Sequence, residues 1–211
     1  GDEHTHQAQG HRKQQRRPLA VQPSSRWASW RSCVVRSDGK SASLTAPSGA
    51  AQQRLLVAAL ASAGMEARAL ALNEAHGTGT PLGDPLEASS LSAAILQDRH
   101  ATTDYPAPSL PIGAVKSNIG HAEPAAGMTG LLRLVHGLRT PAAAPNAHLR
   151  ALNPHVGEAL RGVCCALPTQ THCLPSDGSR AGGLSSFGYS GTIAHALLES
   201  HTAGDVQASA A

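Results

Sequence analysis

Two histidines and a lysine stand in glycine-rich turns that each follow a short apolar segment. His76 lies in EAHGTGTPLGDP, whereas Lys116 and His121 lie in KSNIGHAEP. Imidazole N–H groups can donate to a developing oxyanion or enolate, and a nearby ammonium group keeps imidazoles neutral and oriented. Thr78 and Thr80 add hydroxyls that can bond an amide or a carbonyl. These groups together fit carbon–carbon bond formation through a thioester enolate, although either histidine taken alone would more often be structural.

The segments around these turns alternate between strand and helix patterns, which predicts an α/β layered fold. Residues 67–75 and 111–115 predict strands that end just before His76 and Lys116. Reactive groups in open α/β sheets collect at the carboxyl ends of the strands. We therefore expect His76, Lys116 and His121 to converge at one edge of the sheet.

Other periodic segments supply the elements that flank this edge. Residues 45–65 predict a loop followed by a helix that ends at Gly64 and has one apolar face, made of Leu55, Leu56, Ala59 and Leu60. Further strands are predicted at residues 162–167, 180–188 and 192–199.

Two more helices are predicted directly after the reactive turns. One covers residues 84–96, with Asp84 as N-cap, Pro85 at its first position and Glu87 completing a capping box. The other follows Lys116 and contains Gly127 and Gly130. Because each glycine weakens a helix by about 1 kcal/mol relative to alanine, their presence predicts a close backbone approach by another element.

The amino-acid composition indicates the kind of core that the chain can form and argues against a membrane protein. Hydrophobic residues make up 41% of the 211 residues, but aromatic residues only 2%, so the core must consist mainly of Ala, Leu and Val. No run of 18 apolar residues is present, and no membrane span is expected. We expect a cytoplasmic location; an organelle stays open, since the sequence has no clear targeting signal.

Both ends of the sequence differ from its centre. Residues 1–35 are predicted to form a basic, disordered extension, because the first 36 residues hold seven Lys or Arg against two acids and lack hydrophobic periodicity. A solvated extension is favoured over a nucleic-acid-binding arm, so no nucleic acid partner is expected. Residues 36–199 are predicted to fold, and residues 200–211 to form a flexible tail.

The four cysteines do not suggest a disulfide framework. Cys164 and Cys165 are adjacent, and together with His172 and Cys173 they raise the alternative of a metal cluster. No C-x-x-C unit is present, which favours ordinary thiols, no metal site and a reducing, intracellular location.

Three segments closely resemble the carboxy-terminal motifs of β-ketoacyl synthases, specifically the ketosynthase domains of modular-type polyketide synthases. They are EAHGTGTPLGDPLEA, GAVKSNIGHAEPAAG and GGLSSFGYSGTIAHALLE. DGKSASLTAPSGAAQQ and NAHLRALNPHV resemble the segments between them, so the resemblance runs from about Arg36 to Glu199.

The resemblance implies a thiolase-like layered α/β fold, of which this chain is the C-terminal half only. Such enzymes have a duplicated five-layer arrangement whose two halves share one core. The implied reaction is a decarboxylative Claisen condensation of an acyl thioester with a malonyl-type thioester, in polyketide or fatty acid synthesis. The implied partners are an acyl carrier protein, the missing N-terminal ketosynthase half and a second copy in a homodimer. No cofactor is expected to bind directly; the phosphopantetheine arm of the carrier brings the substrate.

The resemblance also implies roles for single residues. His76 and His121 are similar to the two active-site histidines that support malonyl decarboxylation and stabilise the enolate. Lys116 is similar to the family's active-site lysine, and Glu123 to the acidic residue that partners it.

Three further residues match binding positions of the family. Thr78 and Thr80 match threonines that bond the phosphopantetheine arm. Tyr189 matches a gating aromatic residue whose backbone N–H supplies half of the oxyanion hole.

The sequence departs from the family pattern at two points. The nucleophilic cysteine of the family lies in a DTACSS-like motif much farther upstream, and none of the four cysteines has that context. Ile193 replaces the asparagine usual in the GTNAH segment. The isolated chain is therefore expected to be inactive, and two interpretations stay open: a ketosynthase segment of a longer synthase, or a non-catalytic fragment or dimerisation module.

Overall fold

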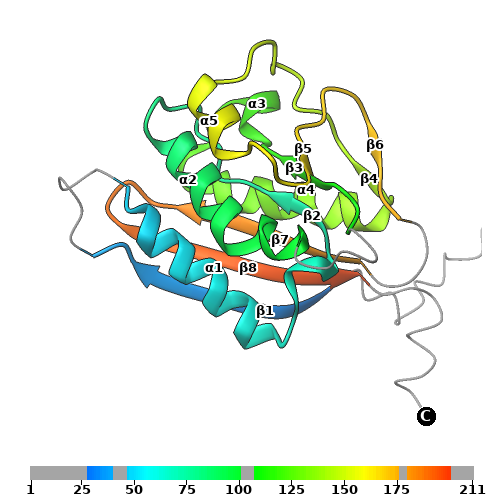
Figure 1. Ribbon diagram of the computed structural model, residues 1–211, viewed down its shortest axis with the longest axis horizontal. Helices are drawn as coiled ribbons and strands as arrows, with labels where there is room; N and C mark the ends of the chain where they lie inside the picture. The colour runs from blue at the N-terminus through cyan, green and yellow to red at the C-terminus, as the bar shows by residue number, and fades with distance from the viewer. Residues whose placement is uncertain (1–27, 40–46, 101–106, 176–179, 201–211) are drawn as a thin grey trace, which may run out of the picture.

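A six-stranded mixed sheet with helices on both faces forms the centre of the computed structural model, which describes residues 28–39, 47–100, 107–175 and 180–200 (Figure 1). In spatial order its strands are β1 (Ser29–Ser37), β8 (Thr192–Ser200), β7 (Arg180–Phe187), β2 (Leu70–Glu74), β3 (Leu110–Gly113) and β5 (Cys165–Ala166). The pairs β1–β8 and β8–β7 are antiparallel, whereas β7–β2, β2–β3 and β3–β5 are parallel. The expected α/β class is confirmed.

Helices and short turns connect these strands. The helices are α1 (Gly49–Ala63), α2 (Gly83–Leu91), α3 (Lys116–Ile119), α4 (Ala126–Arg139) and α5 (Pro154–Ala159). Two short strands, β4 (Ala142–Ala143) and β6 (His172–Cys173), pair separately. Tight helical turns occupy Ala67–Ala69, Ser92–Leu96, Asp98–His100 and Glu123–Ala125. Within the described ranges, no helix combines the length and the apolarity that crossing a membrane would need.

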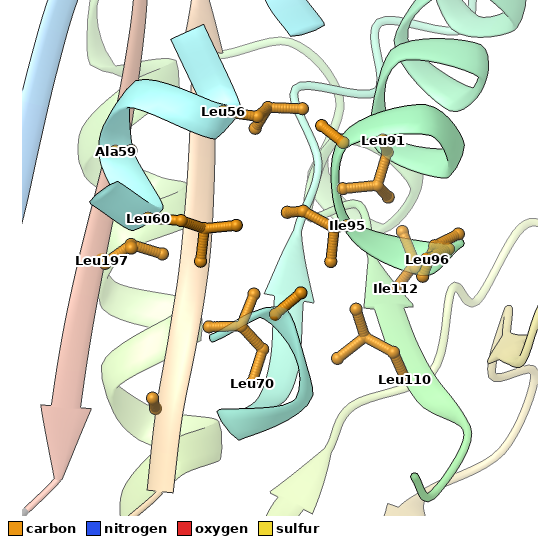
Figure 2. Packing of buried hydrophobic residues seen from close by; sticks show 13 residues of the cluster. Leu56, Ala59, Leu60, Leu70, Leu91, Ile95, Leu96, Leu110, Ile112 and Leu197 are labelled. Atoms are coloured by element: carbon orange, nitrogen blue, oxygen red, sulfur yellow. The ribbon is translucent and has the colours of Figure 1, made fainter. Parts of the chain in front are cut away.

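One core lies between the sheet and the helices α1 and α2. Leu56 and Leu60 of α1 and Leu91 of α2 pack with Leu70 and Ile112 of the strands (Figure 2). The apolar face predicted for the first helix is buried, and α1 ends at Gly64 with a left-handed φ of 61°. Both predictions for this helix are therefore confirmed.

The second core lies on the opposite face of the sheet, under α4, where Leu134 and Leu138 pack with Leu72 of β2 and Leu184 of β7. A Cβ atom added to Gly130 would lie 2.8 Å from Leu184 Cδ1. The helix therefore approaches the sheet as closely as its glycines predicted.

Strand β1 corrects one boundary predicted from the sequence. Residues 1–35 were expected to be disordered, but the strand begins at Ser29 and pairs with β8 from Ser29 opposite Glu199 to Ser37 opposite Thr192. Trp30 and Val35 are 57% and 60% exposed, because β1 is an edge strand. β1 is stabilised by pairing with β8, which lies more than 150 residues away in the sequence. Local periodicity therefore does not predict this strand. Residues 1–27 and 201–211 lie outside the described residues.

Other predicted boundaries also differ from the structure, including that of the strand predicted at 111–115, which spans Leu110–Gly113 as β3. Within the strand predicted at 67–75, residues Ala67–Ala69 form a 3-10 turn before β2. Within the strand predicted at 162–167, only Cys165–Ala166 pair with β3. The helix predicted at 84–96 begins at Gly83 and continues after Leu91 as a π-helical turn.

A glycine substitution in α4 tests the close packing of this helix. A Cβ atom at Gly137 would lie 2.7 Å from Leu72 Cδ2 and 3.0 Å from the carbonyl oxygen of Ala142. We expect Gly137→Ala to lower the free energy of unfolding by about 1–3 kcal/mol, as overpacking does. Gly157→Ala in α5 is the control, because its Cβ would make only an ordinary 3.4 Å contact. Urea denaturation measures both, and similar changes in the two variants would contradict the close approach.

Candidate active site

The predicted catalytic residues meet at the carboxyl ends of two neighbouring parallel strands. β2 ends at Glu74, two residues before His76, and β3 ends at Gly113, three residues before Lys116. Glu74 lies opposite Gly113 in the sheet. The two turns therefore leave the sheet side by side, and α3 leads from Lys116 to His121.

His76 is held by contacts to its backbone and to Nδ1. Lys116 Nζ donates to the carbonyl oxygen of His76 at 2.5 Å and lies 3.5 Å from His76 Nδ1. The backbone N–H of Phe187 also points at His76 Nδ1, at 3.4 Å. Because Nδ1 faces two donors, it carries the lone pair, and Nε2 carries the proton of the neutral ring.

Burial, with the charge of Lys116 and then of His121 adding to it, lowers the pKa of His76 to about 4. The imidazole is therefore neutral throughout the physiological range. A neutral ring with its proton on Nε2 is a hydrogen-bond donor that carries no competing charge.

His121 is fixed in the same tautomer by a different donor. The backbone N–H of Glu123 donates to His121 Nδ1 at 2.8 Å. Glu123 adopts a φ of +46°, a left-handed conformation that costs an L-residue about 1–2 kcal/mol. The two imidazole rings lie 6.1 Å apart and perpendicular, at 89°. Two Nε2–H donors are thus available at one site.

Two acids expected to cap α2 bind the turn that carries His76 instead. Glu87 accepts the backbone N–H groups of His76 (2.7 Å) and Gly77 (2.9 Å), and Asp84 accepts that of Gly79 (3.0 Å). The residue at the N-cap of α2 is Leu82, which makes no side-chain capping bond. The predicted capping box is wrong, because N–H groups of the preceding turn compete successfully for both carboxylates. Burial raises the pKa of Glu87 to about 7 and also raises that of Asp84.

Glu123 was expected to partner Lys116, and the structure does not join them. Among the described residues, the three ion pairs found involve neither side chain. Burial lowers the pKa of Lys116, and the negative charges of Glu87, Glu74 and Asp84 oppose this shift. The acids that act on Lys116 therefore come from α2 and from the end of β2.

A cavity of about 920 Å³ opens in front of the two histidines. Six of the seven site residues predicted from the sequence line it: His76, Thr78, Thr80, His121, Glu123 and Tyr189. Lys116 instead lines a second cavity of about 550 Å³, to which Thr78, Glu87 and His121 also contribute. None of the four cysteines lines either cavity.

The predicted binding residues stand at the wall of the larger cavity. Thr78 Oγ1 lies 3.3 Å from Thr80 Oγ1, and Thr80 Oγ1 accepts the N–H of Gly83 at 3.1 Å. The side chain of Tyr189 is 87% exposed. The aromatic ring that touches a histidine is that of Phe187, 5.3 Å from His76, which the sequence did not single out.

The pKa of His76 can be measured against that of a second buried histidine. Burial alone lowers the pKa of His195 to about 4. We expect both rings to titrate near pH 4 by imidazole NMR. Lys116→Gln should raise the pKa of His76 and leave that of His195 unchanged. Because the unfolded chain takes up these protons near pH 6.5, both histidines should lower stability as the pH falls from 6.5 to 4. Titration of His76 near 6.5 would contradict this environment.

Known proteins of similar sequence and fold show the family to which this chain belongs. The profile of the family "Beta-ketoacyl synthase, C-terminal domain" matches residues 27–150. The chain is 42% identical over 167 residues to mycoketide-CoA synthase of Mycobacterium tuberculosis, which covers 79% of the chain and 4% of that protein. It is 43% identical over 169 residues to erythronolide synthase EryA2 of Saccharopolyspora erythraea, covering 80% and 5%.

Solved ketosynthase structures have the same fold. The oxazolomycin ketosynthase domain OzmH KS7 of Streptomyces albus superimposes with a TM-score of 0.75 at 34% identity. Ketosynthase twelve of the bacillaene synthase of Bacillus amyloliquefaciens gives 0.74 at 32%. Each match covers 83% of this chain and 30% of the ketosynthase, so the chain spans less than a third of those domains. The expected thiolase-like fold is confirmed, and the chain belongs to the β-ketoacyl synthase family, among the ketosynthases of polyketide synthases.

Proposed function

We propose that residues 28–200 form the carboxy-terminal part of a ketosynthase that catalyses decarboxylative Claisen condensation, with His76, His121 and Lys116 as catalytic residues. The observation that carries this proposal is the pair of imidazoles that are each bonded at Nδ1 and face a common cavity, so that their Nε2 atoms are available as donors. Two preorganised Nε2–H donors stabilise the oxygen of a thioester enolate better than water does, because they need no reorganisation during the reaction.

In this reaction the carbon–carbon bond to the malonyl carboxylate breaks and carbon dioxide leaves. The electron pair passes into the thioester enolate, whose oxygen accepts hydrogen bonds from His76 and His121. The enolate carbon then attacks the carbonyl of an acyl-cysteine, and the cysteine leaves as a thiolate. Lys116 keeps His76 neutral during these steps, since its positive charge opposes protonation of the ring.

The acyl-accepting cysteine comes from outside the described residues in this proposal. Cys33 lies on β1, Cys164 and Cys165 lie at or beside β5, and Cys173 lies on β6. None of the four lines the cavity that His76 and His121 face. The amino-terminal half of a ketosynthase would supply the nucleophile, and without it this region acts as a non-catalytic module.

In this proposal the larger cavity also binds the arm of the substrate carrier. Thr78 and Thr80 would bond the amide groups of the phosphopantetheine arm of an acyl carrier protein, with Tyr189 at the entrance. No directly bound cofactor is needed for this chemistry. A homodimeric complete enzyme, the fatty acid alternative and the cytoplasmic location stay predictions.

The outer face of α4 supports the proposed partner half. Met128 and Leu132, one helical turn apart, are 58% and 63% exposed. Residues four apart project from the same face of a helix. A second layer of structure on this face would bury both side chains.

A paired assay tests the catalytic role of His76. The enzyme is a complete ketosynthase made by joining residues 28–200 to the amino-terminal half of a related polyketide ketosynthase. We expect His76→Ala to leave acyl transfer to the cysteine intact and to slow carbon dioxide release about 10²–10³-fold, the usual cost of one preorganised donor. His195→Asn, a change at a fully buried histidine outside the cavity, is the control and should affect both steps alike. Equal losses in both steps for His76→Ala would refute its catalytic role.

The face of α4 is tested by binding. We expect the chain to co-purify with a separately expressed amino-terminal ketosynthase half, and Leu132→Glu to abolish this, because a carboxylate cannot be buried there without a partner. Val57→Glu is the matched control: Val57 is 50% exposed but lies on α1, on the opposite face of the sheet. Loss of binding in both variants, or in neither, would contradict the assignment of this face.

A further inference from the structure

A buried ion pair lies directly behind the proposed catalytic turns. Glu74 is the last residue of β2, and Arg133 lies in α4. Arg133 Nε is 3.5 Å from Glu74 Oε2, and their side chains are only 11% and 1% exposed. The other two ion pairs of the described residues are much more exposed. The sequence alone did not single out either residue.

The second carboxylate oxygen of Glu74 reaches the neighbouring strand exit. Glu74 Oε1 accepts the backbone N–H of Val115 at 2.6 Å, and Val115 immediately precedes Lys116. On the backbone, the N–H of Ala75 donates to the carbonyl oxygen of Gly113 at 2.7 Å. The carboxylate therefore joins the strand that leads to His76 with the turn that carries Lys116.

Arg133 connects the same carboxylate to a third segment. Its Nη2 donates to the carbonyl oxygens of Ala144 (2.7 Å) and Pro145 (3.1 Å). The next residue, Asn146, accepts the N–H of Ala114 at 2.8 Å and donates to the carbonyl oxygen of Ile112 at 3.1 Å. The carboxyl end of β3 is therefore held by Glu74 through Val115, and by Asn146 through Ala114 and Ile112.

Two glycines leave room for the ion pair of Glu74 and Arg133. A Cβ atom on Gly113 would lie 2.5 Å from Glu74 Oε2 and 3.3 Å from Arg133 Cζ. A Cβ atom on Gly130 would lie 3.5 Å from Glu74 Cγ. Replacing a buried ion pair by apolar residues is often neutral or stabilising, so stability alone does not account for a pair built in this way.

We propose that Glu74 and Arg133 are positioning residues that hold the His76 turn and the Lys116 turn in register. The proposal rests on the proposed function in one respect only, namely that His76 and Lys116 are the reacting residues. Glu74 acts through the backbone of Val115 and does not line the cavity in front of the histidines.

The charges around Glu74 support this role. Burial raises the pKa of Glu74 to about 7, and Arg133 is the largest influence that opposes the shift. Lys116 from α3 also lowers this pKa, and Glu87 from α2 raises it. Without Arg133 the pKa of Glu74 would rise further, and less of its negative charge would act on Lys116.

The first test uses the chain itself, with the imidazole pKa values of His76 and His195 followed by NMR. The central variant is the double change Glu74→Gln with Arg133→Met, which leaves no unpaired buried charge and therefore should keep the fold. We expect the pKa of His76 to rise above its wild-type value of about 4 as Lys116 loses its position, although burial still holds it below 6.5, while that of His195 stays near 4. Arg133→Lys, which keeps the charge, should restore the wild-type value for His76. An unchanged His76 pKa in the folded double variant would overturn the proposal.

The second test uses the complete ketosynthase described above. We expect the double variant to lower kcat for malonyl decarboxylation roughly tenfold to a hundredfold at unchanged KM, the cost of a small misplacement of catalytic groups. Arg133→Lys should recover most of the rate. If His76→Ala fails its own paired assay while the double variant still shifts the His76 pKa, the proposed function is wrong and the positioning role stands. If the pKa shifts but kcat does not change in an enzyme that needs His76, the positioning role in catalysis is overturned.

Discussion

The parallel pairing of β2 with β3 determines where every group of the candidate site lies. Two parallel strands end at the same edge of a sheet, so the turns after Glu74 and Gly113 emerge as neighbours. The hydrogen bond from Lys116 to the carbonyl oxygen of His76 depends on that adjacency. The leucines of the two cores keep the strands paired, and glycines of α4 allow the helix to press against them. The chemistry of the site is thus a consequence of strand order.

The site combines the neutral imidazole of His76 with several buried ionisable groups. Glu74 and Glu87 both have pKa values raised to about 7 by burial, and the ammonium group of Lys116 lies near both. Both oxygens of Glu87 accept backbone N–H groups of the His76 turn, whereas Glu74 accepts the N–H of Val115 with one oxygen and pairs with Arg133 through the other. Charges that bond backbone atoms can orient a loop without approaching the reacting atoms. This arrangement leaves the two histidines as the hydrogen-bond donors that face the larger cavity.

The reactive turns could be predicted from the sequence, but the residues that support these turns could not. His76, Lys116 and His121 were predictable because each follows a strand exit, and strand exits are visible in local apolar patterns. Glu87 was assigned to a local capping box, whereas its partners lie ten and eleven residues away in the preceding turn. Phe187, 111 residues from His76, reaches it only through the pairing of β7 with β2. Local rules cannot anticipate contacts that the sheet order creates.

The two cavities show how the lysine differs from the histidines in its role. Along the segment from Ala75 to Thr80, Ala75, Gly77 and Gly79 line the smaller cavity, His76 and Thr80 line the larger one, and Thr78 lines both. The segment is therefore a wall, and Lys116 stands behind it. His121 lines both cavities, whereas Lys116 lines only the smaller one and contacts the carbonyl oxygen and Nδ1 of His76. Lys116 is consequently placed to act on His76, where its charge adds to the effect of burial in keeping the imidazole neutral.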